Sequence, residues 1–316
     1  MASTGTPERE STPGIDRPSS FTVAAVQATP VVLDRQATLA VVIDQLATAA
    51  AGGADLVVFP ESFAPCYPDW AWRTSPWSDR EWYDRFASQA VDLDGNDLDD
   101  VRAAANDAGV WVALGVTERV RSGTLYNTVA YIDRDGHLAG RHRKLVPTGA
   151  ERLVWAQGQG DLLTVVDMDG VRVGSLICWE NYMPLARTAM YEQGIDLLLS
   201  PTWDNSDEWI PTLRHIAKEG GVFVVGVSAC IRGSDMPREL AGADEMYGGD
   251  DDWLSKGNST IVAPGGEVIA GPLIGERGVV TASLDLSDIA SARRRFDPVG
   301  HYARPDVVSL TDHRTR

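Results

Sequence analysis

The chain has 316 residues, of which 44% are hydrophobic and 23% are charged, as expected of a globular protein with a large core. Its formal net charge of −17 disfavours nucleic acid and anionic membranes as partners. Its three cysteines are few and odd in number, which argues against a disulfide framework, and no spacing of Cys and His residues is typical of a zinc site.

The first 20 residues are rich in Ser, Thr, Pro and Gly, a composition that predicts a disordered tail without the apolar segment of a signal peptide. No stretch approaches the roughly 20 apolar residues of a membrane span. Together with the sparse cysteines, these features predict a cytoplasmic protein that acts away from membranes.

The first half of the chain opens with a β-α-β unit. We expect a strand at 21–27, a helix capped by Asp34 that ends near residue 51, and a buried strand at 56–59. An aromatic loop follows, and the pattern then predicts helices near 79–90 and 97–108, a strand at 110–116 and a hairpin of 126–132 with 137–143.

The second half continues the alternation of strands and helices. We expect strands at 163–168, 171–177, 195–199, 222–227, 259–262, 267–270 and 279–284, helices at 184–194, 208–220 and 287–295, and a long loop at 233–256. No break in composition separates two domains. The sequence therefore predicts one α/β domain over residues 21–310, with mixed sheets covered by helices, and a tail at 311–316.

Three of the expected strands end near a residue that can do chemistry, namely Glu61, Lys144 and Cys178. Each alone has an ordinary structural explanation, and most free cysteines are small buried hydrophobes. Together they supply a thiol nucleophile, a carboxylate that can take its proton and a cation that stabilises the developing negative charge. The combination indicates acyl transfer.

Three stretches resemble the signature sequences of the nitrilase superfamily, in the family's order and at its approximate spacing: FPESF at 59–63, HRKLVPT at 142–148 and CWENYMP at 178–184. The resemblance extends from about residue 21 to about residue 310. It implies a four-layer αββα sandwich with mixed sheets, a Glu61–Lys144–Cys178 triad and no cofactor or metal.

The third stretch is similar to that of true nitrilases, whereas aliphatic amidases and carbamoylases carry Cys-Tyr-Asp there. The segment TGAERLVW at 148–155 is also nitrilase-like and adds Glu151 to the site. Two positions depart from the pattern: Cys66 stands where glycine is usual, and Gly149 stands where many members have histidine. Because neither belongs to the triad, they bear on substrate range rather than on reaction type.

The resemblance implies hydrolysis of a small-molecule nitrile to a carboxylic acid and ammonia through a thioimidate and a thioester on Cys178. In this mechanism Glu61 is the general base, and Lys144 and the N–H of Trp179 stabilise charge on the nitrogen. Glu151 either holds Lys144 and positions water or forms a structural ion pair. Both roles stay open.

Aromatic residues near these strand ends are candidates for the substrate pocket. Trp203 follows the segment 200–202, which comes directly after the strand expected at 195–199, Tyr67 lies in the loop after Glu61, and Trp179 follows the nucleophile. Trp70 and Trp72 are weaker candidates, because aromatic residues more often pack in a core or an interface.

Other readings of the sequence remain open. An amidase or N-carbamoyl hydrolase would use the same triad, and a catalytically silent assembly or binding protein could share the fold. A Cys–His mechanism through His142 or His215 is disfavoured, since polar helix or strand contacts are commoner for such residues. The resemblance further implies a homo-oligomer, either a dimer or a larger spiral. It specifies neither the nitrile nor the ratio of acid to amide.

Overall fold

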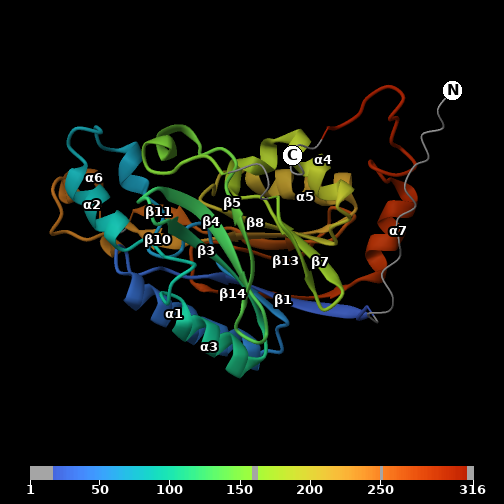
Figure 1. Cartoon of the computed structure of the whole chain (residues 1–316), viewed down its shortest axis with the longest axis horizontal. Coiled ribbons are helices and arrows are strands. Elements are labelled where there is room, and N and C mark those ends of the chain that lie inside the picture. Colours follow the sequence, from blue (N-terminus) through green and yellow to red (C-terminus); the bar gives the residue numbers. More distant parts are fainter. Residues whose placement is uncertain (1–16, 159–162, 250–251, 312–316) are drawn as a thin grey trace.

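A computed structural model describes residues 17–158, 163–249 and 252–311 of the chain. Two six-stranded mixed sheets stack on each other, and helices cover their outer faces (Figure 1). This arrangement confirms the predicted four-layer αββα sandwich. Most of the expected tail at 1–20 and of the tail at 311–316 lies outside the described residues, and the first strand begins at Ser20.

The first sheet has the strand order β14-β1-β2-β3-β4-β5. Its strands are β1 (Ser20–Gln27), β2 (Leu56–Val58), β3 (Trp111–Arg119), β4 (Leu125–Ile132), β5 (Leu138–Arg143) and β14 (Gly278–Asp285). β2 pairs in parallel with both β1 and β3, whereas the other neighbours are antiparallel. A parallel central strand is buried on both faces, which explains the continuous apolar run of β2.

The second sheet has the order β13-β12-β9-β8-β7-β6. Its strands are β6 (Val165–Met168), β7 (Val171–Ser175), β8 (Leu197–Thr202), β9 (Phe223–Ser228), β12 (Ser259–Val262) and β13 (Val268–Leu273). β7, β8 and β9 are parallel to one another. Their carboxyl ends therefore meet at one edge of the sandwich, where parallel sheets place their ligands.

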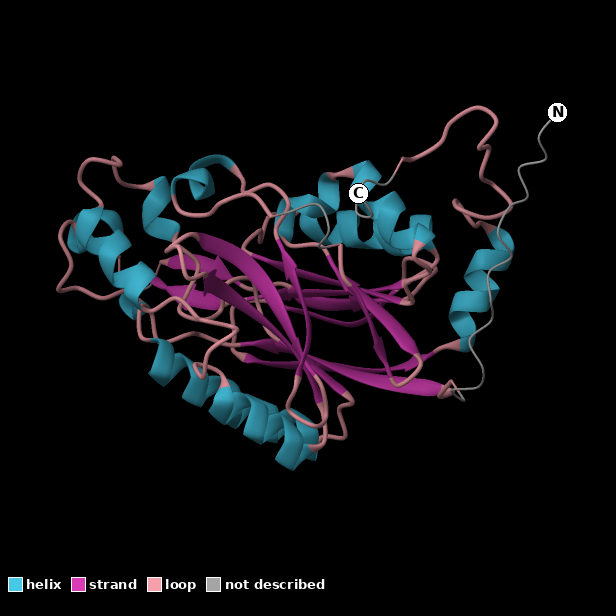
Figure 2. Cartoon of the chain, viewed as in Figure 1, coloured by secondary structure: helices cyan, strands magenta, loops and turns pink. Residues whose placement is uncertain are grey.

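Apolar side chains hold the four layers together. A central core between the two sheets includes Val23 and Val58 of the first sheet and Val173 and Leu199 of the second, all at most 1% exposed. Helices α1 (Arg35–Ala51) and α3 (Asp99–Ala108) pack on the outside of the first sheet, and α4 (Pro184–Glu192) and α5 (Trp209–Gly220) on the outside of the second (Figure 2). The last helix, α7 (Ser287–Arg295), lies at one end of the sandwich.

The prediction of one long loop at 233–256 was wrong. This part of the chain contains a 3-10 helix at Gly233–Asp235, helix α6 (Ala243–Met246) and strand β11 (Trp253–Lys256), which pairs with β10 (Cys230–Arg232). Tertiary contacts stabilise these short elements: Tyr247 is buried against Trp82 of helix α2 (Arg80–Ser88), and the Arg232 guanidinium lies 3.8 Å from the centre of the Trp253 ring. Local sequence carries no signal for such distant partners.

Two strand ends differ from the prediction in a way that matters for the site. β7 ends at Ser175 rather than at 177, and the chain turns from there into a 3-10 helix at Cys178–Tyr182. β8 extends to Thr202 rather than stopping at 199. The extension brings Thr202 beside Cys178.

Candidate active site

The three predicted strand ends come together at one edge of the sandwich. Glu61 follows β2, Lys144 directly follows β5, and Cys178 follows β7. Glu61 and Lys144 come from the first sheet, whereas Cys178 comes from the second. All three are at most 5% exposed. The site is therefore built across the interface between the two sheets.

Cys178 occupies a sharp turn between strand and helix. Its φ of +53° lies in the left-handed region, which is strained for a residue with a side chain. The Asn181 side chain supports this turn by donating hydrogen bonds to the carbonyl oxygens of Leu176 and Cys178, at 2.7 and 2.8 Å. Cys178 and Trp179 head the 3-10 helix, so their N–H groups have no partner within that helix and are suited to bind developing negative charge.

A buried ammonium joins the two carboxylates. Lys144 Nζ lies 2.8 Å from Glu61 Oε1 and 2.7 Å from Glu151 Oε2. The Asn127 side chain donates to Glu61 Oε1, and the backbone N–H of Trp203 donates to Glu61 Oε2, each at 2.8 Å. These contacts fix both oxygens of Glu61.

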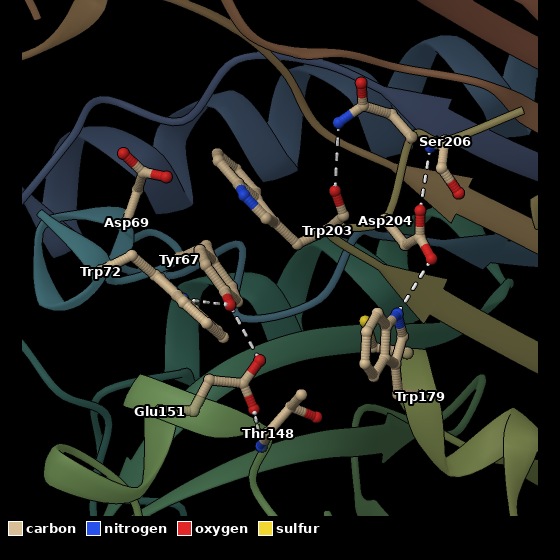
Figure 3. A pocket seen from close by; sticks show the side chains of 11 residues that line it. Tyr67, Asp69, Trp72, Thr148, Glu151, Trp179, Trp203, Asp204 and Ser206 are labelled. Carbon is tan, nitrogen blue, oxygen red and sulfur yellow. Dashed lines mark hydrogen bonds between the residues drawn. The ribbon is translucent and has the colours of Figure 1, made fainter.

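Glu151 lies in the 3-10 helix Gly149–Leu153 and is held from two further sides. The Tyr67 hydroxyl donates to Glu151 Oε1 at 2.8 Å, and the backbone N–H of Thr148 donates to Oε2 at 2.7 Å. The same hydroxyl accepts a hydrogen bond of 3.0 Å from Trp72 Nε1 (Figure 3). A hydrogen-bonded chain thus runs from the pocket wall through Glu151 to Lys144.

The cluster changes the proton affinities of its members. Burial raises the pKa of the Cys178 thiol, an effect strengthened by the Glu61 carboxylate and opposed by the Lys144 ammonium. Burial also raises the pKa of Glu61, and the Lys144 ammonium opposes that shift. Burial alone would lower the pKa of Lys144, yet the surrounding negative groups raise it. The resting site therefore combines a protonated thiol with an ammonium and a carboxyl group of increased basicity.

A cavity of about 510 Å³ opens beside these groups. Its lining consists of Tyr67, Asp69, Trp72, Thr148, Glu151, Cys178, Trp179, Trp203, Asp204, Asn205 and Ser206 (Figure 3). Tyr67 and Trp203 stack with their ring centres 4.5 Å apart, and Trp179 donates to Asp204 Oδ2 at 2.9 Å. The walls combine aromatic rings with carboxylates, and no Lys, Arg or His belongs to this set.

The three proposed substrate-binding residues, Tyr67, Trp179 and Trp203, all line the cavity. Trp72 also lines it, whereas Trp70 does not and is fully buried in the core cluster that also contains Tyr67. Sequence reasoning could not separate these two, which are only two positions apart.

Of the two positions that depart from the family pattern, Gly149 has a clear structural reason. Its φ is +52°, and a Cβ there would lie 2.4 Å from Trp72 Cη2. A histidine at this position would require Trp72 to move. Cys66 is buried in the loop after Glu61, where burial raises the pKa of its thiol to about 12, and it is not among the residues that line the cavity.

Sequence reasoning missed two residues of the site. Asn127, inside β4, donates to Glu61 Oε1 at 2.8 Å, and the Thr202 hydroxyl donates to Cys178 Sγ at 3.2 Å. His142 and His215 are not in the cavity lining: His142 pairs with Glu180 at 2.9 Å, and His215 contacts Glu219 at 3.1 Å.

Among the described residues, one set of side chains has the spacing of a possible metal site, namely Asp133, Asp135 and His137. They lie in and beside the β4–β5 turn, at the opposite end of β5 from Lys144, and are mostly exposed. No helix in the described part of the chain is both long and apolar enough to cross a bilayer.

The fold belongs to the class of layered α/β sandwiches whose pocket lies at the carboxyl ends of strands from both sheets. The family profile described as carbon-nitrogen hydrolase matches residues 22–294, and the chain belongs to this family.

Two relatives cover most of the chain. It is 43% identical to a protein named aliphatic nitrilase from Sinorhizobium fredii (strain HH103), over 92% of this chain and 95% of that protein. It is 40% identical to a bifunctional nitrilase/nitrile hydratase, NIT4B, from Nicotiana tabacum, over 93% and 87% of the two chains.

Solved structures support the fold. Nit3 from Saccharomyces cerevisiae, a member of branch 10 of the nitrilase superfamily, superposes with a TM-score of 0.72 at 20% identity, over 93% of this chain and all of that one. An amidase from Nesterenkonia sp. gives a TM-score of 0.67 at 22% identity, over 90% and 100%.

Proposed function

We propose that the protein is a nitrilase, which hydrolyses an organic nitrile to the carboxylic acid and ammonia. The observation that carries this proposal is the buried Lys144, which joins Glu61 to Glu151 at the edge of the cavity that Cys178 lines. The likeness to a protein named aliphatic nitrilase supports it.

In the first half of the reaction, Cys178 Sγ attacks the nitrile carbon while its proton passes to Glu61. Attack is coupled to proton transfer because the raised pKa keeps the resting thiol protonated. The negative charge that develops on the nitrile nitrogen is stabilised by Lys144 and by the N–H of Trp179. Glu61 then returns the proton to this nitrogen, which gives a neutral thioimidate.

In the second half, Glu61 takes a proton from water, and the resulting hydroxide adds to the thioimidate carbon. The tetrahedral intermediate receives that proton on nitrogen, which gives an amino group beside the new hydroxyl. Transfer of the hydroxyl proton to the same nitrogen, through Glu61, then expels ammonia and leaves a thioester. A second water, activated by Glu61 in the same way, releases the carboxylic acid and restores the thiol. Glu151 orients Lys144 through their 2.7 Å contact, so its proposed role combines ion pairing with positioning.

The tetrahedral intermediate has a second exit. If the thiolate leaves instead of ammonia, the product is the amide. Relatives from tobacco that are 40 and 41% identical to this chain are named bifunctional nitrilase/nitrile hydratase, which makes amide release the second activity to test here.

We also propose a domain range, an oligomeric state and a cellular location for the protein. Residues 21–310 form one domain, since this range contains the family match and both sheets except the first residue of β1. The protein assembles as a homo-oligomer, a proposal supported by the exposed Leu185 of α4 and the exposed Tyr182 just before this helix, at 69 and 42% exposure. Its three unpaired cysteines suit the reducing conditions of the cytoplasm.

The proposal is tested by incubating the purified protein with aliphatic, arylaliphatic and aromatic nitriles, with cyanide, and with the amide that matches each nitrile. Ammonia, acid and amide are all measured. We expect acid and ammonia from at least one nitrile, and a loss of about 10³-fold or more in kcat for Cys178→Ala. Turnover of amides alone would establish the amidase alternative, and no turnover of any compound would favour the silent assembly protein.

A further inference from the structure

We infer that Glu180 is a positioning residue that sets the placement of Lys144 relative to Cys178. Its Oε2 accepts the backbone N–H of Ile177, the residue before Cys178, at 2.6 Å. Its Oε1 accepts the backbone N–H of Leu145, the residue after Lys144, at 2.6 Å. One carboxylate therefore ties together the two chain segments that carry the nucleophile and the cation.

The connection crosses the sandwich. Lys144 follows β5 of the first sheet, whereas Cys178 follows β7 of the second. The two sheets are packed mainly through apolar side chains, whose contacts are non-directional. Hydrogen bonds from two backbone N–H groups to a single carboxylate also fix the orientation and register of the two chain segments. Hydrogen bonds to a charged group are stronger than those between neutral groups.

A third donor completes the arrangement. His142 Nε2 lies 2.9 Å from Glu180 Oε2, and both side chains are fully buried. Residues two positions apart along a strand face the same side, so the side chains of His142 and Lys144 lie on the same side of the chain at the end of β5. The pair thus attaches β5 to the turn at Cys178 just before the strand delivers the ammonium.

This geometry explains why a carboxylate is required at position 180. Glutamine has one carbonyl oxygen and one NH₂ group, so it can accept from Ile177 and His142 or from Leu145, but not from both sides. In Glu180→Gln, one backbone N–H must lose its acceptor. The segment that loses it is then free to shift, and a misplacement of about 1 Å can reduce a rate about 100-fold.

The test measures Glu180→Gln in three ways: kcat and KM with the best nitrile, thermal unfolding, and the rate at which iodoacetamide alkylates Cys178 at a fixed pH. The kinetic part rests on the proposed function, whereas the alkylation part does not. We expect kcat to fall about 100-fold with KM within about threefold of the original. Alkylation should slow by about threefold or more, because a displaced Lys144 stabilises the thiolate less.

Asp196→Asn is the matched control. Asp196 is also a buried carboxylate that accepts a backbone N–H, that of Arg172, but it lies at the opposite end of β8 from Thr202. It should lose stability and keep both kcat and the alkylation rate. If Glu180→Gln lowers only the unfolding temperature and behaves like Asp196→Asn in the other measurements, the positioning role is refuted.

His142→Asn provides a second variant in case Glu180→Gln does not fold. It keeps the two backbone contacts of Glu180 and removes the imidazole, so we expect a smaller loss of kcat, about tenfold, with slower alkylation. An unchanged kcat and alkylation rate in folded His142→Asn would overturn the inference. If the wild-type protein hydrolyses no nitrile, slower alkylation in either variant supports the inference while the proposed function fails.

Discussion

The role of Glu151 can be resolved through Tyr67, because the Tyr67 hydroxyl contacts Glu151 and does not contact Lys144. Tyr67→Phe removes the hydrogen bond of 2.8 Å to the buried Glu151 carboxylate and the one of 3.0 Å that Trp72 Nε1 donates to the hydroxyl, while keeping the ring that stacks on Trp203 at 4.5 Å. A hydrogen bond to a charged group contributes about 1.5–3 kcal/mol.

If the whole free energy of this hydrogen bond stabilises the transition state through Lys144, its loss lowers kcat about 10- to 150-fold, since each 1.4 kcal/mol corresponds to about tenfold. The measurement is steady-state kinetics with one neutral nitrile, together with thermal unfolding. Tyr191→Phe is the control: its hydroxyl donates to Glu219 at 2.9 Å, within the helix layer outside the cavity. It should lower stability and leave kcat unchanged.

If kcat is unchanged in Tyr67→Phe and only stability is reduced, Glu151 is a structural ion-pair partner of Lys144 and does not act on the reaction. A fall in kcat of the predicted size, with the control unaffected, would establish that Glu151 acts on the reaction through Lys144.

Three further predictions follow from the site. Burial raises the pKa of Glu61 above 4.5, the ordinary pKa of a glutamate, and the base must be ionised to act. As the pH is lowered, kcat/KM should therefore begin to fall while the pH is still above 4.5; a profile that stays flat down to pH 4.5 would contradict this. Gly149→Ala should lower the unfolding temperature by about 2–4 °C because φ is positive there, and it should change KM because the added Cβ displaces Trp72. Gly53 also has a positive φ but has open space around the position of a Cβ, so Gly53→Ala should leave KM unchanged. A nitrile that carries a carboxylate should have a kcat/KM about tenfold below that of its methyl ester, because carboxylates and no cations line the cavity; a preference for the acid would be evidence against this account of the pocket.

Much of the fold was predictable because its elements have strong local signals. Asp34 caps α1 through the N–H of Ala37, and Pro184 begins α4, as the sequence patterns indicate. The apolar run of β2 predicts a strand buried on both faces. These features depend on near neighbours in the chain, so the sequence alone is enough to find them.

The residues of the candidate active site differ in the same way. Glu61, Lys144 and Cys178 could be proposed from the sequence because each follows a recognisable strand. Thr202 was missed because Pro201 lacks an N–H and favours an end to the strand before it, yet β8 continues through both residues. Asn127 was missed because it lies inside β4 and reaches Glu61 only after the sheet has formed.

The link from Glu180 to both segments was also hidden in the sequence. Its partners Ile177 and Leu145 are 3 and 35 residues away, and both donate through the backbone. Because any residue except proline has a backbone N–H, the residue types at these positions do not indicate the contact. Only the packing of β5 against the turn at Cys178 makes the contact visible.

The attack of Cys178 on the nitrile carbon is tested by trapping the covalent intermediate. The protein is mixed with a nitrile that it hydrolyses, quenched in acid during turnover and analysed by peptide mass spectrometry. We predict an added mass equal to the nitrile or to the matching acyl group on the peptide that contains Cys178, and no such adduct in Cys178→Ala. Turnover without any adduct on Cys178, or an adduct on Cys66 or Cys230 instead, would contradict the account.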